Sequence, residues 1–157
     1  MAKLFWSERL SVGVPELDED HKTLIDIINA LRDDAEAGEA SAKRVSKQLN
    51  ALIRYAETHF AREERVMSVC GYKALPEHHE EHEDFVAKIT EVARRFRDDP
   101  EGSKELVGDE LLEYLENWLI KHILVVDMDY KPLVQGKREA SEAAQSLKGT
   151  EITRIVI

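Results

Sequence analysis

The chain contains four long segments whose apolar residues recur at the spacing of an α-helix. These segments cover residues 18–36, 41–69, 77–98 and 103–125. Short breaks containing glycine or proline separate them, at Gly38, at Gly71–Pro76 and at Asp98–Gly102. Short connections between long helices make neighbouring helices antiparallel, so the pattern predicts an all-α, up-down-up-down four-helix bundle.

The 157 residues are enough for one hydrophobic core and too few for two. We expect residues 1–17 to form an ordered irregular arm. Residues 1–132 are interpreted as the bundle domain, and residues 133–157 as a C-terminal extension of unknown role. Lys137–Leu147 has a helical bias, and the simplest expectation is that the extension docks on the bundle.

Composition limits the classes of partner and of metal site. A net charge of -10 argues against nucleic acid or an anionic membrane as a partner, since both attract basic proteins. The chain lacks the roughly 18 consecutive apolar residues of a membrane span, and its start lacks the apolar core of a signal peptide, so a cytoplasmic location is expected. With Cys70 as the single cysteine, a metal would need nitrogen and oxygen ligands.

The third predicted helix begins with a histidine-rich stretch, PEHHEEHEDF, at residues 76–85. At about 100° per residue, His78 and His82 lie on either side of the centre of that helix's apolar stripe. His79 falls near the edge of the stripe and is expected at the surface. Two inward imidazoles one turn apart can bind the same metal ion.

The other three predicted helices also direct polar groups inward. His59 lies at the flank and Glu63 near the centre of the second stripe, whereas Glu64 points away from it. His21 lies at the edge of the apolar face of the first helix, and His122 lies within that of the fourth. A carboxylate on an apolar face is costly unless it is paired or bound to a metal.

Asp127 joins this set only if the fourth helix is irregular. It follows His122 by five residues and would point about 140° away from it on a straight α-helix. We therefore predict that the helix ends or distorts near Val125 and Val126, so that Asp127 turns toward the histidines.

A single inward histidine is more often a hydrogen-bonded core residue than a metal ligand. Five of them on converging helices are different, because unsatisfied buried polar groups cost about 1–3 kcal/mol each. Five imidazoles and two bridging carboxylates supply nine ligand atoms, which suits two six-coordinate ions with a shared solvent oxygen and one open position. A ferritin-like di-iron site is excluded, because no Glu-x-x-His motif surrounds these histidines.

Four stretches resemble the hemerythrin family in its bacterial single-domain form: VGVPELDEDHKTL, HFAREERVM, GYKALPEHHEEHEDF and WLIKHILVVD. The resemblance runs from Trp6 to Tyr130. It implies one iron bound by His21 and His59, a second bound by His78, His82 and His122, and bridges from Glu63 and Asp127. It also implies an oxygen pocket lined by Phe60, Trp118, Leu119 and Ile123.

The resemblance implies reversible dioxygen binding at a non-haem, oxo- or hydroxo-bridged di-iron centre, for oxygen storage, delivery or scavenging. It implies no catalytic residues, and the apolar pocket offers no proton relay, so an enzyme is not expected. The alternative is a module that senses oxygen or redox state and signals through a protein partner of unknown identity. Asp20 stands where the family often has glutamine, and is expected to affect a surface hydrogen bond only.

Overall fold

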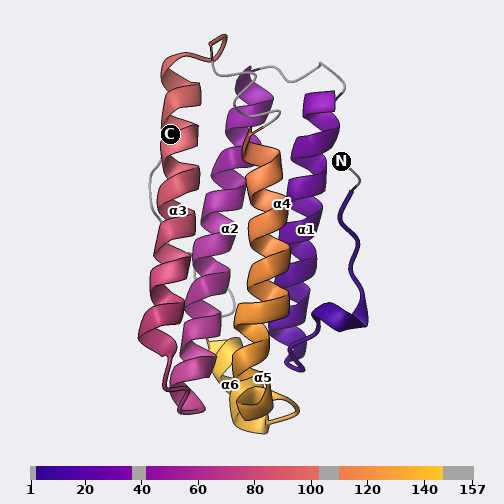
Figure 1. Ribbon diagram of the computed structural model, residues 1–157, viewed down its shortest axis with the longest axis vertical. Helices are drawn as coiled ribbons and strands as arrows, with labels where there is room; N and C mark the ends of the chain where they lie inside the picture. The colour runs from indigo at the N-terminus through magenta and orange to yellow at the C-terminus, as the bar shows by residue number, and fades with distance from the viewer. Residues whose placement is uncertain (1–2, 37–41, 103–109, 147–157) are drawn as a thin grey trace.

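The computed structural model describes residues 3–36, 42–102 and 110–146, and within these ranges it contains helices and no strand. The long helices are α1 (Pro15–Glu36), α2 (Ala42–Val69), α3 (Leu75–Asp98) and α4 (Leu112–Lys121). Figure 1 shows them side by side with alternating direction, and α5 and α6 at the lower end of the bundle. The predicted all-α antiparallel four-helix bundle is confirmed.

The first helix begins earlier than the predicted residue 18. Pro15 is its first residue, a position that proline favours because its fixed φ is helical and no donor is lost. A short 3-10 turn, η1 (Glu8–Leu10), precedes the helix. After this turn, the Ser11 hydroxyl and the Val12 backbone N–H donate hydrogen bonds to the carboxylate of Asp18 in α1. The predicted irregular arm is therefore tied to the start of α1.

The fourth helix continues beyond the predicted residue 125, while the predicted residues 103–109 lie outside the described ranges. It passes through a π-helical turn, η3 (His122–Asp127), into α5 (Met128–Val134). Tyr130 and Val134 of α5 are fully buried, and this burial explains why the helix does not stop at residue 125.

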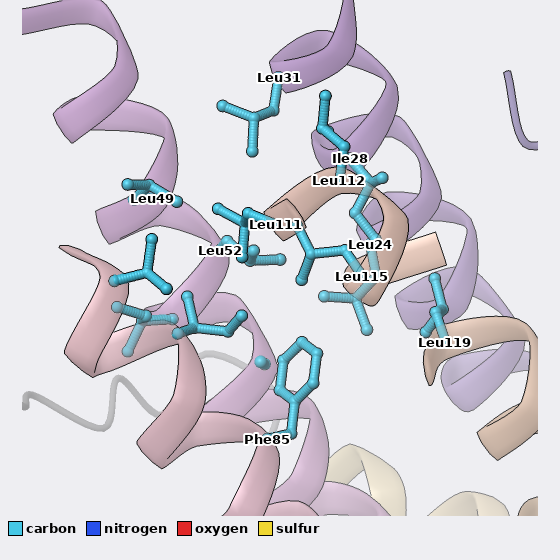
Figure 2. Packing of buried hydrophobic residues seen from close by; sticks show 14 of the residues in the cluster. Leu24, Ile28, Leu31, Leu49, Leu52, Phe85, Leu111, Leu112, Leu115 and Leu119 are labelled. Atoms are coloured by element: carbon cyan, nitrogen blue, oxygen red, sulfur yellow. The ribbon is translucent and has the colours of Figure 1, made fainter. Parts of the chain in front are cut away.

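The predicted apolar stripes meet in the centre of the bundle. Figure 2 shows Leu24 and Ile28 of α1, Leu52 of α2, Phe85 of α3 and Leu115 of α4 directed into the shared core. Each fully buried side chain of this kind contributes about 1.5–3 kcal/mol to the free energy of folding. The helices among the described residues are too short or too polar to cross a membrane.

A second apolar cluster closes the lower end of the bundle. It includes Val14, Leu17 and Met67 from the bundle and three buried alanines, Ala140, Ala143 and Ala144, from α6 (Arg138–Ser146). The Ser141 hydroxyl and the Gln145 amide of α6 also donate hydrogen bonds to Glu16. The described part of the extension thus packs on the bundle; residues 147–157 lie outside the described ranges, and the division at residue 132 stays a prediction.

Candidate metal centre

Seven polar side chains lie between the central core and the lower cluster, and all are at least 97% buried: His21, His59, Glu63, His78, His82, His122 and Asp127. Helices α1, α2 and α3 each supply at least one of them, and η3, which continues α4, supplies His122 and Asp127. The helical spacing thus predicted that these seven residues face inward. It also distinguished His78 from its neighbour His79, which has half of its side chain exposed. Their role as metal ligands remains a proposal.

The carboxylate of Glu63 lies between two groups of histidines. Its Oε1 atom is 3.8 Å from His21 Nε2 and 3.7 Å from His59 Nε2. Its Oε2 atom is 3.4 Å from His78 Nε2 and 2.9 Å from His82 Nε2. Each oxygen faces a different group, which is the arrangement a carboxylate needs to bridge two metal ions.

Asp127 provides a second carboxylate in the same arrangement. Its Oδ2 atom is 3.3 Å from His21 Nε2, and its Oδ1 atom is 3.1 Å from both His78 Nε2 and His122 Nε2. This placement depends on η3, because a π-helix brings residues five apart onto one face. The predicted distortion near Val125 and Val126 is therefore confirmed.

Several ligand atoms converge on the centre of the site, which is the arrangement expected around bound metal ions. The Nε2 atoms of His78 and His82 each lie 3.1 Å from that of His122, so three imidazoles of one group converge. Four ligand atoms, His21 Nε2, Glu63 Oε2 and both Asp127 oxygens, are buried without a hydrogen-bond partner among the described residues. Buried polar atoms are normally satisfied, so these are expected to bind a cation.

The electrostatics of the site also favour a cation. Burial by itself would lower the pKa of His21, but the carboxylates of Asp127 and Glu63 outweigh it and raise this pKa to about 10. The same balance raises the pKa of His78 to about 10. Burial would raise the pKa of Glu63, but His59 and the other histidines hold it well below its usual range. In the metal-free protein, protons therefore take the place of metal charge.

A pH dependence follows for the metal-free protein. His21 and His78 have a higher pKa folded than unfolded, so their protons stabilise the folded state fully below about pH 6.5 and progressively less up to about pH 10. We expect the Tm of the metal-free protein to fall between pH 7 and 10. The iron-loaded protein should show a smaller fall, because metal replaces these protons. Thermal unfolding followed by circular dichroism tests this, and equal falls in both forms would contradict it.

Sequence reasoning missed the groups that contact the other nitrogen of the histidines. Asp20 Oδ2 lies 3.0 Å from His59 Nδ1, and Asp20 is 4% exposed, so the expectation that it affects only a surface hydrogen bond is wrong. The spacing could have revealed this, because Asp20 lies three residues after Leu17 and four before Leu24, both buried. Asp20 lies on the inward face of α1, but as a charged residue it was expected at the surface.

Two further carboxylates make comparable contacts from more exposed positions. Glu64, which the spacing placed off the stripe, has Oε2 2.9 Å from His82 Nδ1 and Oε1 2.6 Å from His79 Nδ1. Glu81 Oε2 lies 3.2 Å from His122 Nδ1. Three of the five buried histidines thus face the centre with Nε2 and a carboxylate with Nδ1, the usual orientation of metal-binding imidazoles.

The predicted pocket residues lie beside the centre, and Phe60 lies near both histidine groups, with its ring centroid 5.7 Å from that of His59. Phe60 stacks on His82, with ring centroids 3.8 Å apart, and Trp118 stacks on His122 at 4.3 Å. Trp118 is partly buried, and Leu119 and Ile123 are buried, at 3% and 0% exposure. These four side chains make that side of the centre apolar, while their role in binding oxygen remains a proposal.

Comparison with known proteins identifies the family. The model of the hemerythrin HHE cation-binding domain matches residues 12–134. The chain is 33% identical to a bacteriohemerythrin of Pseudomonas paraeruginosa, covering 94% of this chain and 97% of that protein. It is 34% identical to a bacteriohemerythrin of Methylococcus capsulatus, covering 84% and 97%.

A crystal structure of wild-type hemerythrin superposes with a TM-score of 0.75 at 29% identity, covering 86% of this chain and 100% of that one. The resemblance expected from the four sequence stretches is therefore confirmed over the bundle. Because the family model spans most of the chain and relatives above 30% identity span nearly all of it, this chain belongs to the hemerythrin family.

Proposed function

We propose that this protein binds dioxygen reversibly at a non-haem di-iron centre, for oxygen storage, delivery or scavenging. Hemerythrins bind dioxygen at such a centre, so family membership supports this function and this cofactor. The observation that carries the proposal is the placement of Glu63 and Asp127, each of which directs one oxygen toward each histidine group. That placement suits a pair of metal ions, because each oxygen faces a different histidine group.

The contacts support a division of ligands between the two irons. His21 and His59 approach Glu63 Oε1 and would hold one iron, while His78, His82 and His122 would hold the other. Five nitrogens and four carboxylate oxygens leave the two-histidine iron with fewer protein ligands than its neighbour. With a solvent oxygen shared between two six-coordinate ions, this ligand set would leave one position at that iron for dioxygen.

The surroundings of the centre support binding rather than turnover. When bound, the di-iron centre supplies the electrons that dioxygen binding requires. Phe60, Trp118, Leu119 and Ile123 would line the oxygen pocket, and none of them carries an ionisable group that could donate a proton or hold water there. We therefore propose a carrier or store without catalytic residues, located in the cytoplasm and with dioxygen as its ligand.

Visible absorption of the anaerobically reduced, iron-loaded protein tests this function. The spectrum would be recorded before oxygen is admitted, with oxygen present, and after oxygen is removed. Reversible binding predicts a charge-transfer band that develops with the gas and disappears when the gas is removed. A band that never forms, or an immediate change to the fully oxidised spectrum, would contradict the proposal.

Leu119→Tyr is expected to accelerate autoxidation. The substitution places a hydroxyl donor in the proposed pocket, and a positioned proton donor contributes about 10²-fold or more to the rate of a proton-dependent step. Loss of the oxygenated spectrum over time measures autoxidation. Leu119→Phe is the matched control, because phenylalanine has a ring of the same size as tyrosine but no hydroxyl group. Equal autoxidation rates for the tyrosine variant and the parent would contradict the assignment of Leu119 to the oxygen pocket.

The contacts of the described residues do not favour the sensing alternative. It depended on movement of the unexplained end of the chain, whose last residues, 147–157, lie outside the described ranges. The described part of the extension is packed against α1 and α2 through buried alanines. These contacts give no separate support to signalling.

A further inference from the structure

Asp20 occupies a site built around its carboxylate. Arg62 holds it with two hydrogen bonds, from Nε to Oδ2 at 2.9 Å and from Nη2 to Oδ1 at 2.8 Å. The Tyr55 hydroxyl donates to Oδ1 at 3.1 Å, and His59 Nδ1 lies 3.0 Å from Oδ2. Arg62 and Tyr55 thus hold both carboxylate oxygens in place. The imidazole of His59 therefore lies beside a negative charge whose position is fixed.

This contact distinguishes the two histidine groups. In the two-histidine group, Asp20 contacts His59, while the Nδ1 atom of His21 has no hydrogen-bond partner among the described residues. In the three-histidine group, the carboxylates at Nδ1 come from Glu64 and from Glu81, whose side chain is 48% exposed. Solvent weakens the contacts of these partly exposed carboxylates more than it weakens the buried Asp20 contact.

We infer that Asp20 is a positioning residue of the two-histidine iron site, a step that rests on the proposed di-iron function. By accepting the Nδ1 proton of His59, its carboxylate fixes the tautomer that directs the Nε2 lone pair toward the metal. The negative charge also makes that nitrogen a stronger donor. The site with fewer histidines thereby keeps its iron, and Arg62 keeps the carboxylate in place.

Chelator-driven release of iron from the loaded protein tests this inference. In Asp20→Asn the amide oxygen can still accept the Nδ1 proton, but the charge is lost. Loss of a group that supports a ligand usually lowers metal affinity about 10–100-fold, so one iron per chain should leave faster than in the parent by up to about that factor. The other iron should leave at the parental rate. Glu19→Gln is the matched control, since it removes the same charge from an exposed neighbour that pairs with Lys22. It should release both irons at the parental rate.

Other outcomes would overturn the inference. Parental release of both irons by Asp20→Asn shows that the carboxylate does not strengthen His59, and equal acceleration of both shows a general loss of structure. Asp20→Asn leaves Arg62 without its anionic partner, so the double variant Asp20→Asn/Arg62→Gln removes both charges together. This double variant should also release one iron faster than the parent and the other at the parental rate. A parent that fails to bind two irons contradicts the proposed function itself, before any variant is compared.

Chemical rescue separates the carboxylate from the fold. Asp20, Tyr55 and Arg62 line a cavity of about 290 Å³ between α1, α2 and α6, which is large enough to admit formate. In Asp20→Ala, added formate should bind beside Arg62 and slow the release of the less stable iron toward the parental rate, whereas chloride at the same ionic strength should not. Identical effects of formate and chloride would show that His59 needs no carboxylate partner.

Discussion

His122→Ala is expected to yield a protein with at most one iron per chain and no oxygen-dependent visible band. The substitution removes one of three converging imidazoles, and Asp127 Oδ1 loses a nitrogen 3.1 Å away. The loss in metal affinity should exceed the about 10–100-fold that loss of a mere supporting group causes. In the metal-free protein, unsatisfied buried polar atoms should also lower the free energy of unfolding by about 1–3 kcal/mol.

Iron analysis by plasma emission, together with the absorption spectrum, measures this effect. The matched control is His79→Ala, which removes a histidine from the same acidic stretch. Within the described part of the chain His79 pairs with Glu64, and it is half exposed, so its loss should change stability by less than about 1 kcal/mol and leave iron content unchanged. Loss of iron from His79→Ala, or two irons retained by His122→Ala, would contradict the ligand assignment.

Insertion of one alanine after Val125 is expected to be as damaging as loss of a ligand. Val125 lies within the π-helical turn and is 61% exposed, so an alanine added there disturbs little buried surface. One additional residue would rotate Asp127 by about 100° relative to His122. A bridging carboxylate would then be lost, and the iron content should fall to one or none per chain.

Val125→Ala is the control, because it shortens the same side chain and keeps the number of residues in the turn. This variant should bind two irons like the parent. Iron content and the oxygen-dependent band again provide the measurement, and circular dichroism confirms that each variant is folded. If the insertion variant kept both irons and bound oxygen normally, the number of residues in the turn would not be what places Asp127 in the site.

The inward histidines could be predicted because helical spacing determines the direction of a side chain. His78 and His79 are neighbours of the same type, yet the spacing alone assigned one to the interior and the other to the surface, as the structure shows. The same spacing distinguished Glu63 from Glu64. It failed for Asp20, because a charged residue on an inward face is expected to be surface-exposed unless its partners are known. Those partners, His59 and Arg62, are about forty residues away along the chain.

The sequence by itself determined the helices, their antiparallel order and the inward faces, because all three depend on local spacing and on short connections. Only the tertiary structure decided which oxygen of Glu63 faces which histidine, and that Arg62 holds Asp20 against His59. It also decided that η3 is a π-helix that brings Asp127 to the centre. These features depend on the positions of atoms on different helices, which periodicity within a single helix does not specify.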